Sequence, residues 1–97
     1  MSKVTLAQRI IHKIIERFSQ SNVTPYTAEE LCVQLHLPIS IVQPIILELA
    51  TCQLLSAVEI SDNPTPRYLP ARDTKLLNDE AISEALGNNG ESLILSH

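Results

Sequence analysis

The sequence has little of what DNA-binding and membrane-spanning proteins usually rely on. Its 97 residues hold two tyrosines, one phenylalanine and two glycines, and seven Lys and Arg stand against eleven Asp and Glu, for a net charge of −4. An acidic balance argues against unaided binding to a phosphate backbone, because lysine and arginine supply the sequence-independent part of DNA affinity. With so few aromatic residues, the core must be built from Ile, Leu, Val and Ala.

Long apolar runs are also missing. No stretch approaches the ~20 apolar residues that a membrane span requires, and the N-terminal residues lack the apolar centre of a signal sequence. The chain as it stands is therefore expected to be soluble and cytoplasmic. A soluble fragment of a larger membrane protein would have the same composition.

Cysteine and histidine give no ligand pattern. Cys32 and Cys52 are not in a C-x-x-C pair, and both fall among apolar residues of predicted helices, which favours free, buried thiols; a disulfide or a reactive thiol is the alternative. His12, His36 and His97 lie in different segments without metal-ligand spacing. Glycine-rich phosphate loops and G-x-S-x-G turns are absent as well. We therefore predict no metal, no cofactor, no small-molecule ligand and no enzymatic activity.

The N-terminal segment, residues 3–20, is predicted to be an amphipathic helix. Apolar residues at three- and four-residue spacing mark its core face: Ala7, Ile10, Ile11, Ile14, Ile15 and Phe18. The opposite face carries Arg9, Lys13 and Arg17, which we call the basic stripe. Its simplest interpretation is a solvated face, and the functional alternative is contact with anionic lipid or nucleic acid.

Two further helices, 28–36 and 39–52, are predicted to form a helix-turn-helix. The first begins at a T-x-x-E capping box, Thr27 and Glu30, and ends near His36 because Pro38 disfavours a helical conformation before it. The second has a core face of Val42, Ile45, Ile46, Leu49 and Ala50. Its opposite face holds Ser40, Gln43, Pro44, Leu47, Glu48 and Thr51. Pro44 removes one helical hydrogen bond and should bend or loosen its turn.

A hairpin and a last helix complete the predicted domain. Strands are expected at 54–60 and 67–70, with a loop at 61–66, and a helix at 74–86 capped by Asp73 or Asn78. Gly87 should end that helix, with residues 87–97 forming a flexible tail whose apolar triplet at 93–95 could pack onto a neighbouring chain. The predicted fold is a winged helix-turn-helix, mostly α with a small β-hairpin wing, in one domain over residues 1–86.

The segment 27–58, followed by RYLPARD at 67–73, resembles the C-terminal cytoplasmic winged-helix region of the YihY/BrkB family of bacterial inner-membrane proteins. Some members carry an old ribonuclease BN label. The most specific match, which we call the family-like motif, includes Tyr68, Pro70, Arg72 and Asp73. The resemblance implies that the chain is a fragment from the cytoplasmic side of the inner membrane, joined to the membrane only through an upstream region.

Two features near the wing bear on this resemblance, and the second of them departs from the usual winged-helix pattern. Arg72 and Asp73 are expected to fix the exit from the wing by hydrogen bonding rather than to contact a ligand. Winged-helix sequences usually have Gly where this chain has Gln53, because a left-handed residue is unstrained only for Gly. Either Gln53 accepts a positive φ, or the helix before it ends differently.

The third helix decides between the functional hypotheses. Base edges are read chiefly by Arg, Lys, Asn and Gln, but its exposed face has no Lys or Arg and the wing adds only Arg67, beside Asp62. We therefore predict a non-enzymatic interaction module that acts by protein contact or self-association. Its candidate contact face is Ser40, Gln43, Pro44, Leu47 and Thr51. The alternative is a DNA-binding regulator with the basic stripe on the same side as the third helix, and nuclease activity rests on the family label alone.

Overall fold

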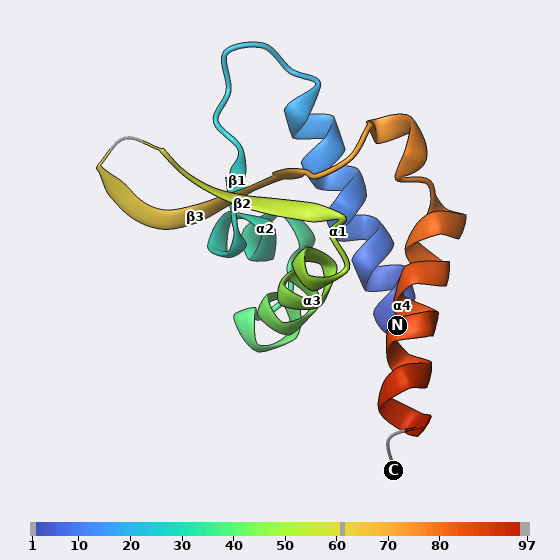
Figure 1. The fold of residues 1–97 in the computed structure, drawn as a ribbon. Helices are drawn as coiled ribbons and strands as arrows, with labels where there is room; N and C mark the ends of the chain where they lie inside the picture. Colours follow the sequence, from blue (N-terminus) through green and yellow to red (C-terminus); the bar gives the residue numbers. More distant parts are fainter. Residues whose placement is uncertain (1, 61, 96–97) are drawn as a thin grey trace.

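Over its described residues, the chain folds as a winged helix-turn-helix with four α-helices, a 3-10 helix and a three-stranded antiparallel sheet (Figure 1). The computed structural model describes residues 2–60 and 62–95, and for residues 88–95 it describes the backbone alone. The elements are α1 (Lys3–Phe18), β1 (Tyr26–Thr27), α2 (Ala28–Leu35), α3 (Ile39–Thr51), β2 (Leu55–Ile60), β3 (Asn63–Pro70), the 3-10 helix η1 (Thr74–Leu76) and α4 (Asp79–Leu95).

Helix α1 forms one wall of the core. The Ser2 hydroxyl caps it by accepting from the Thr5 amide, and its buried side chains are Leu6, Ala7, Ile10, Ile11 and Ile14. Phe18 was expected in this set, and that prediction is wrong: the ring is 54% exposed. Phe18 is the final residue of α1, where the covered face ends. The helix is also shorter than the predicted 3–20.

Helix α2 begins as the sequence predicts. The Thr27 hydroxyl accepts from the Glu30 amide at 3.1 Å, and the Glu30 carboxylate accepts from the Thr27 amide at 2.9 Å. Both bonds of the capping box are therefore present. The helix ends at Leu35, because His36 adopts a left-handed conformation with φ of 56°.

Helix α3 buries the predicted core face, Val42, Ile45, Ile46 and Leu49, with Ala50 half-buried. Pro44 lies inside the helix. Its ring nitrogen has no hydrogen to donate to the Ser40 carbonyl, and both residues are exposed, so water can bind that carbonyl instead. The exposed position explains why a proline is accepted in the middle of this helix.

The sheet has the strand order β1-β3-β2, with β3 in the middle. Strand β1 was not predicted; it pairs Tyr26 with Tyr68 and Thr27 with Arg67. The predicted loop at 61–66 is wrong, because β3 already begins at Asn63; Ser61 lies outside the described residues. Residues 63–66 of β3 have β2 on one side and an open edge on the other. Pro64 and Pro66, which have no amide hydrogen to donate, are tolerated beside such an edge.

The predicted helix at 74–86 is divided in two. The Asp73 carboxylate accepts from the Lys75 amide and starts η1, and the Asn78 side chain accepts from the Ala81 amide at the start of α4. Each alternative cap is therefore used, for a different helix. Because of this break, Leu77 packs into the core at 2% exposure, whereas Leu76 is 61% exposed.

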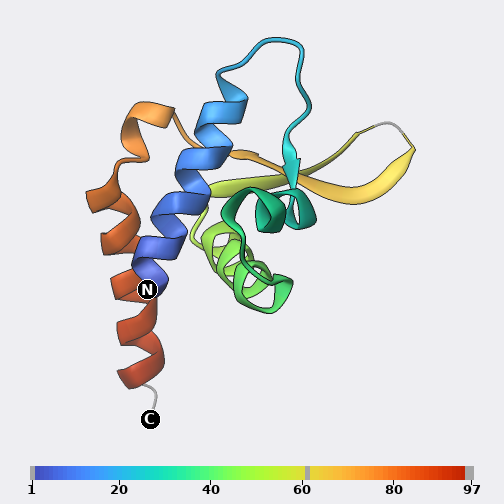
Figure 2. The same ribbon diagram turned by 180° about the vertical axis from the view of Figure 1, so that it is seen from behind.

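Helix α4 runs antiparallel to α1 and lies beside it in both views (Figures 1 and 2). Ile82 and Leu86 are buried, which closes the core on the side of α1. The prediction that Gly87 ends the helix is wrong, because α4 continues to Leu95. The side chains at 93–95, and Ser96 and His97 altogether, lie outside the described residues.

Replacing Gly87 with alanine should stabilise the protein. Gly87 is an interior residue of α4, and an added Cβ would meet nothing within 4 Å. Glycine in an exposed helix interior costs about 1 kcal/mol relative to alanine. We expect Gly87→Ala to raise the free energy of unfolding by about that amount in urea titrations.

The exposed Ser83→Ala change is the matched control, with a smaller gain of about 0.5 kcal/mol from helix propensity alone. A loss of stability in Gly87→Ala would mean that residue 87 is a left-handed cap and that α4 ends there.

Gln53 takes the first of its two options. Its φ is 63°, and the Leu54 amide donates to the Leu49 carbonyl at 2.9 Å, closing the end of α3. A side chain with a Cβ is strained in this conformation. Gln53→Gly should therefore raise the free energy of unfolding by about 1 kcal/mol, measured by urea titration.

Asn22→Gly serves as the control. Asn22 also has a positive φ, of 61°, but asparagine tolerates this region, so little change is expected. Equal stabilisation of both variants would show that strain at Gln53 is not the cause.

Candidate interaction surfaces

The exposed face of α3 is the first candidate surface. Ser40, Pro44, Leu47 and Thr51 are exposed, and Gln43 is half-buried. The sequence reasoning missed Ile39 and Ile41, which are 46% and 42% exposed. Ile41 precedes Pro44 by three residues, so helical spacing could have placed it at the edge of this face. The contact face of α3 is therefore more apolar than predicted.

The one carboxylate predicted on this face is paired. The Lys3 ammonium group of α1 lies 3.0 Å from the Glu48 carboxylate, whose side chain is only 15% exposed. The bond ties the start of α1 to α3. Because α3 itself contains no Lys or Arg, its outward surface carries no positive charge.

A groove of about 300 Å³ lies between α3 and the wing, where a helix-turn-helix would meet a DNA backbone. It is lined by Thr27, Ala28, Glu29, Ile39, Gln43, Thr65, Pro66 and Tyr68. Among the residues that the structure describes, the lining includes no Lys or Arg, and its only charged side chain is the carboxylate of Glu29. This groove would repel a phosphate rather than bind it.

Arg67 is the sole Lys or Arg of the described wing strands, and the fold engages it. Its Nη1 donates to the Pro25 carbonyl at 2.8 Å and to the Glu30 carboxylate at 3.2 Å, and its side chain is 18% exposed. The same Glu30 oxygen accepts from the Thr27 amide. Arg67 therefore joins the wing to the capping box of α2 and is not presented to a partner.

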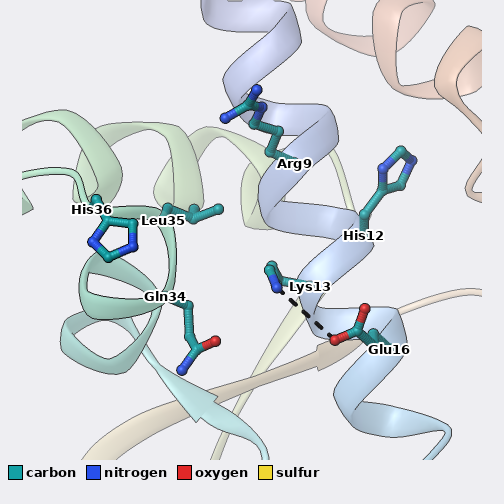
Figure 3. A pocket seen from close by; sticks show the side chains of 7 residues that line it. All are labelled: Arg9, His12, Lys13, Glu16, Gln34, Leu35 and His36. Atoms are coloured by element: carbon teal, nitrogen blue, oxygen red, sulfur yellow. Dashed lines mark ion pairs between the residues drawn. The ribbon is translucent and has the colours of Figure 1, made fainter.

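The basic stripe does not act as one surface. The Arg17 Nε donates to the Thr24 carbonyl at 2.7 Å, and the guanidinium lies 4.7 Å from the centroid of the Tyr26 ring. Arg17 is therefore half-buried and holds the loop before β1. Arg9 and Lys13 line a different groove, between α1 and the end of α2 (Figure 3). None of the three lines the groove beside the wing.

The family-like motif stabilises the fold around the wing. Tyr68 is buried in the middle strand, and Pro70 pairs with Leu55. Arg72 donates from Nε to the Gln53 carbonyl at 3.2 Å and from Nη2 to the Cys52 carbonyl at 3.5 Å. Arg72 and Asp73 hydrogen-bond as expected, each to backbone groups, so they fix the end of α3 and the start of η1.

The histidines and cysteines are dispersed. Within residues 2–60 and 62–95, no group of three or more His, Cys, Asp and Glu is placed to hold a metal ion. His12 lies 2.7 Å from the Asp79 carboxylate of α4, and His97 lies outside the described part. Both thiols are free and half-buried, and burial raises the pKa of Cys32 and of Cys52, so neither is activated as a nucleophile.

None of the helices in the described ranges is both long and apolar enough to cross a lipid bilayer.

Comparison with known proteins shows a likeness of fold. No family model matches the chain, and no curated protein matches it. A crystal structure from Ralstonia eutropha JMP134, described as that of a "putative DNA-binding protein", is similar with a TM-score of 0.55 and 12% sequence identity, over 86% of this chain and 93% of that one. At this identity the likeness establishes the winged-helix architecture and carries no activity with it.

Removing the Arg67 guanidinium should destabilise the fold. Arg67→Met keeps much of the apolar stem but loses two hydrogen bonds, one of them to a carboxylate. Glu30 is 45% exposed, so solvent screens part of the ion pair. We expect the free energy of unfolding to fall by about 1–2 kcal/mol in urea titrations.

Arg9→Met is the matched control, since the exposed Arg9 side chain makes no hydrogen bond or ion pair within the described residues. Its stability should change by less than about 0.5 kcal/mol. Equal losses in the two variants would refute the role given to Arg67.

Proposed function

We propose that this chain is a non-enzymatic winged-helix module that acts by protein contact or self-association through the exposed face of α3. The observation that carries the proposal is the chemistry of this helix. The position that reads DNA in helix-turn-helix proteins here presents apolar side chains and no cation.

The contact face has the composition of a partner site. Ile39, Ile41 and Leu47 are 46%, 42% and 56% exposed, and Pro44 lies between them on the same helix. Ser40, Gln43 and Thr51 add polar side chains to the same face. Protein interfaces commonly combine exposed apolar side chains with polar ones.

The surroundings of α3 support protein contact over DNA contact. Glu29 lines the adjacent groove, Lys3 is paired with Glu48, and the Arg67 guanidinium is engaged by the Pro25 carbonyl and Glu30. A DNA-binding surface needs several free cations, because each phosphate contact contributes through counterion release. The described residues around α3 and the wing offer none of these.

Self-association is the part of the proposal that can be tested with the isolated chain. We expect reversible dimers in sedimentation velocity as the concentration rises from micromolar to millimolar. Leu47→Glu should weaken dimerisation at least about tenfold, because it places a charge in the apolar centre of the interface. Val33→Glu is the control: Val33 is an apolar side chain of α2, 70% exposed, outside the contact face.

Dimers weakened equally by both substitutions would place the interface elsewhere. A wild-type chain that stays monomeric at millimolar concentration would overturn self-association and leave a contact with a different protein.

A second candidate function, a DNA-binding regulator, is favoured by the likeness of fold to the Ralstonia protein. Fluorescence anisotropy with a mixed-sequence duplex at about 50 and about 200 mM salt separates the two candidates. Our proposal requires no micromolar binding at either concentration. Micromolar affinity that falls steeply between them would establish the DNA-binding function and defeat the protein-contact one.

For the biological setting, we propose the cytoplasmic tail of a YihY/BrkB-like membrane protein. The support is the family-like motif, in which Arg72 and Asp73 stabilise the junction of α3, β3 and η1. Membrane-spanning segments encoded upstream in the same reading frame would support this setting, and a different upstream domain would remove it. Ribonuclease activity has no observation behind it beyond the family's label and is not proposed.

A further inference from the structure

The groove between α1 and the end of α2 gathers hydrogen-bond donors from two elements. Arg9, Lys13 and Glu16 of α1 line it together with Gln34, Leu35 and His36 at the end of α2 (Figure 3). His12 also belongs to the lining but points away from α2 and pairs with Asp79 of α4. The groove has a volume of about 300 Å³, the lower end of the range for small-molecule sites.

Its charge is opposite to that of the whole chain. Arg9 and Lys13 outnumber the single carboxylate, Glu16, whereas the protein has a net charge of −4. The Lys13 ammonium lies 3.9 Å from the Glu16 carboxylate, a long ion pair that leaves its hydrogens able to turn to a ligand. Arg9 has no hydrogen-bond or ion-pair partner in the described part of the chain.

Most other cations have a role inside the fold. Contacts with carboxylates, carbonyls or an aromatic ring engage Lys3, Arg17, Arg67 and Arg72. Intramolecular contacts therefore engage the other Lys and Arg side chains of α1 and those around the wing. Arg9 and Lys13 differ from these cations. They lie one helical turn apart on α1 and line a groove, and among the described residues neither bonds to a neighbouring element.

We propose that this groove binds a small anion that carries a phosphate or carboxylate group on an apolar body. The Arg9 guanidinium offers a fork of donors that matches two anionic oxygens, and Lys13 adds a second positive charge. The Gln34 amide can donate to a third oxygen. Half-buried Leu35 gives the apolar part of the ligand a surface to contact.

The ligand would join α1 to the turn of the helix-turn-helix, because His36 is the left-handed residue that ends α2.

NMR titration of the whole chain tests the site. Sulfate, inorganic phosphate and phenyl phosphate are the phosphate-like probes, and acetate and benzoate are the carboxylate probes, all with sodium chloride at matched ionic strength. We expect saturable shifts of the backbone amides of residues 34–37 and of the Arg9 side chain, with the aromatic probe of each pair binding more tightly. Chloride should leave these signals in place. The stronger pair identifies which anionic group the groove prefers.

Substitutions distinguish a site from general attraction. Arg9→Gln with Lys13→Gln should weaken sulfate binding at least about tenfold, while Lys75→Gln, an exposed cation outside the groove, should leave it unchanged.

The substituted side chains are on the surface, and unchanged amide dispersion in the NMR spectra would confirm that each variant folds. Shifts that follow ionic strength alone, that fail to saturate, or that weaken equally in Lys75→Gln would overturn the proposal. None of these outcomes depends on how α3 meets its partner, so the anion site and the proposed function can fail separately.

Discussion

The contact on which the arrangement of the wing depends is the one between Arg67 and Glu30. A single carboxylate oxygen of Glu30 accepts from the Thr27 amide and lies 3.2 Å from the Arg67 guanidinium. The first bond starts α2, and the second holds β3 against it, while Arg67 also reaches the Pro25 carbonyl before β1. Because the bonds share these atoms, the direction of α2, the short strand β1 and the position of the wing are fixed together.

This contact also limits what the fold can do. The arginine that could meet a DNA backbone is turned inward, and the neighbouring groove is lined by polar and apolar side chains with a single carboxylate. Helix α3 is held in the usual place by its buried face, so its outward face is free to differ between proteins with the same architecture. Here that face has Ile41, Pro44 and Leu47, which suits a protein surface.

The positive charges show the same division between fold and function. Helical periodicity puts Arg9, Lys13 and Arg17 on one face of α1, yet the three have different neighbours. Arg17 meets a carbonyl and a tyrosine ring because the chain after α1 returns to form β1. Arg9 and Lys13 meet the end of α2 and remain available. One sequence pattern thus supplies both a structural bond and a candidate ligand site.

By itself, the sequence determined the features that depend on neighbours within a few residues. The capping box at Thr27 and the buried face of α3 follow from local spacing and sterics, whereas the positive φ of Gln53 was one of two alternatives that the sequence left open. Tertiary structure decided the rest. Strand β1 is two residues long and exists only because β3 pairs with it, and Arg67 is engaged by groups 37 and 42 residues away. Contacts across such separations leave no local pattern, so the sequence could name the winged helix but could not assign its cations.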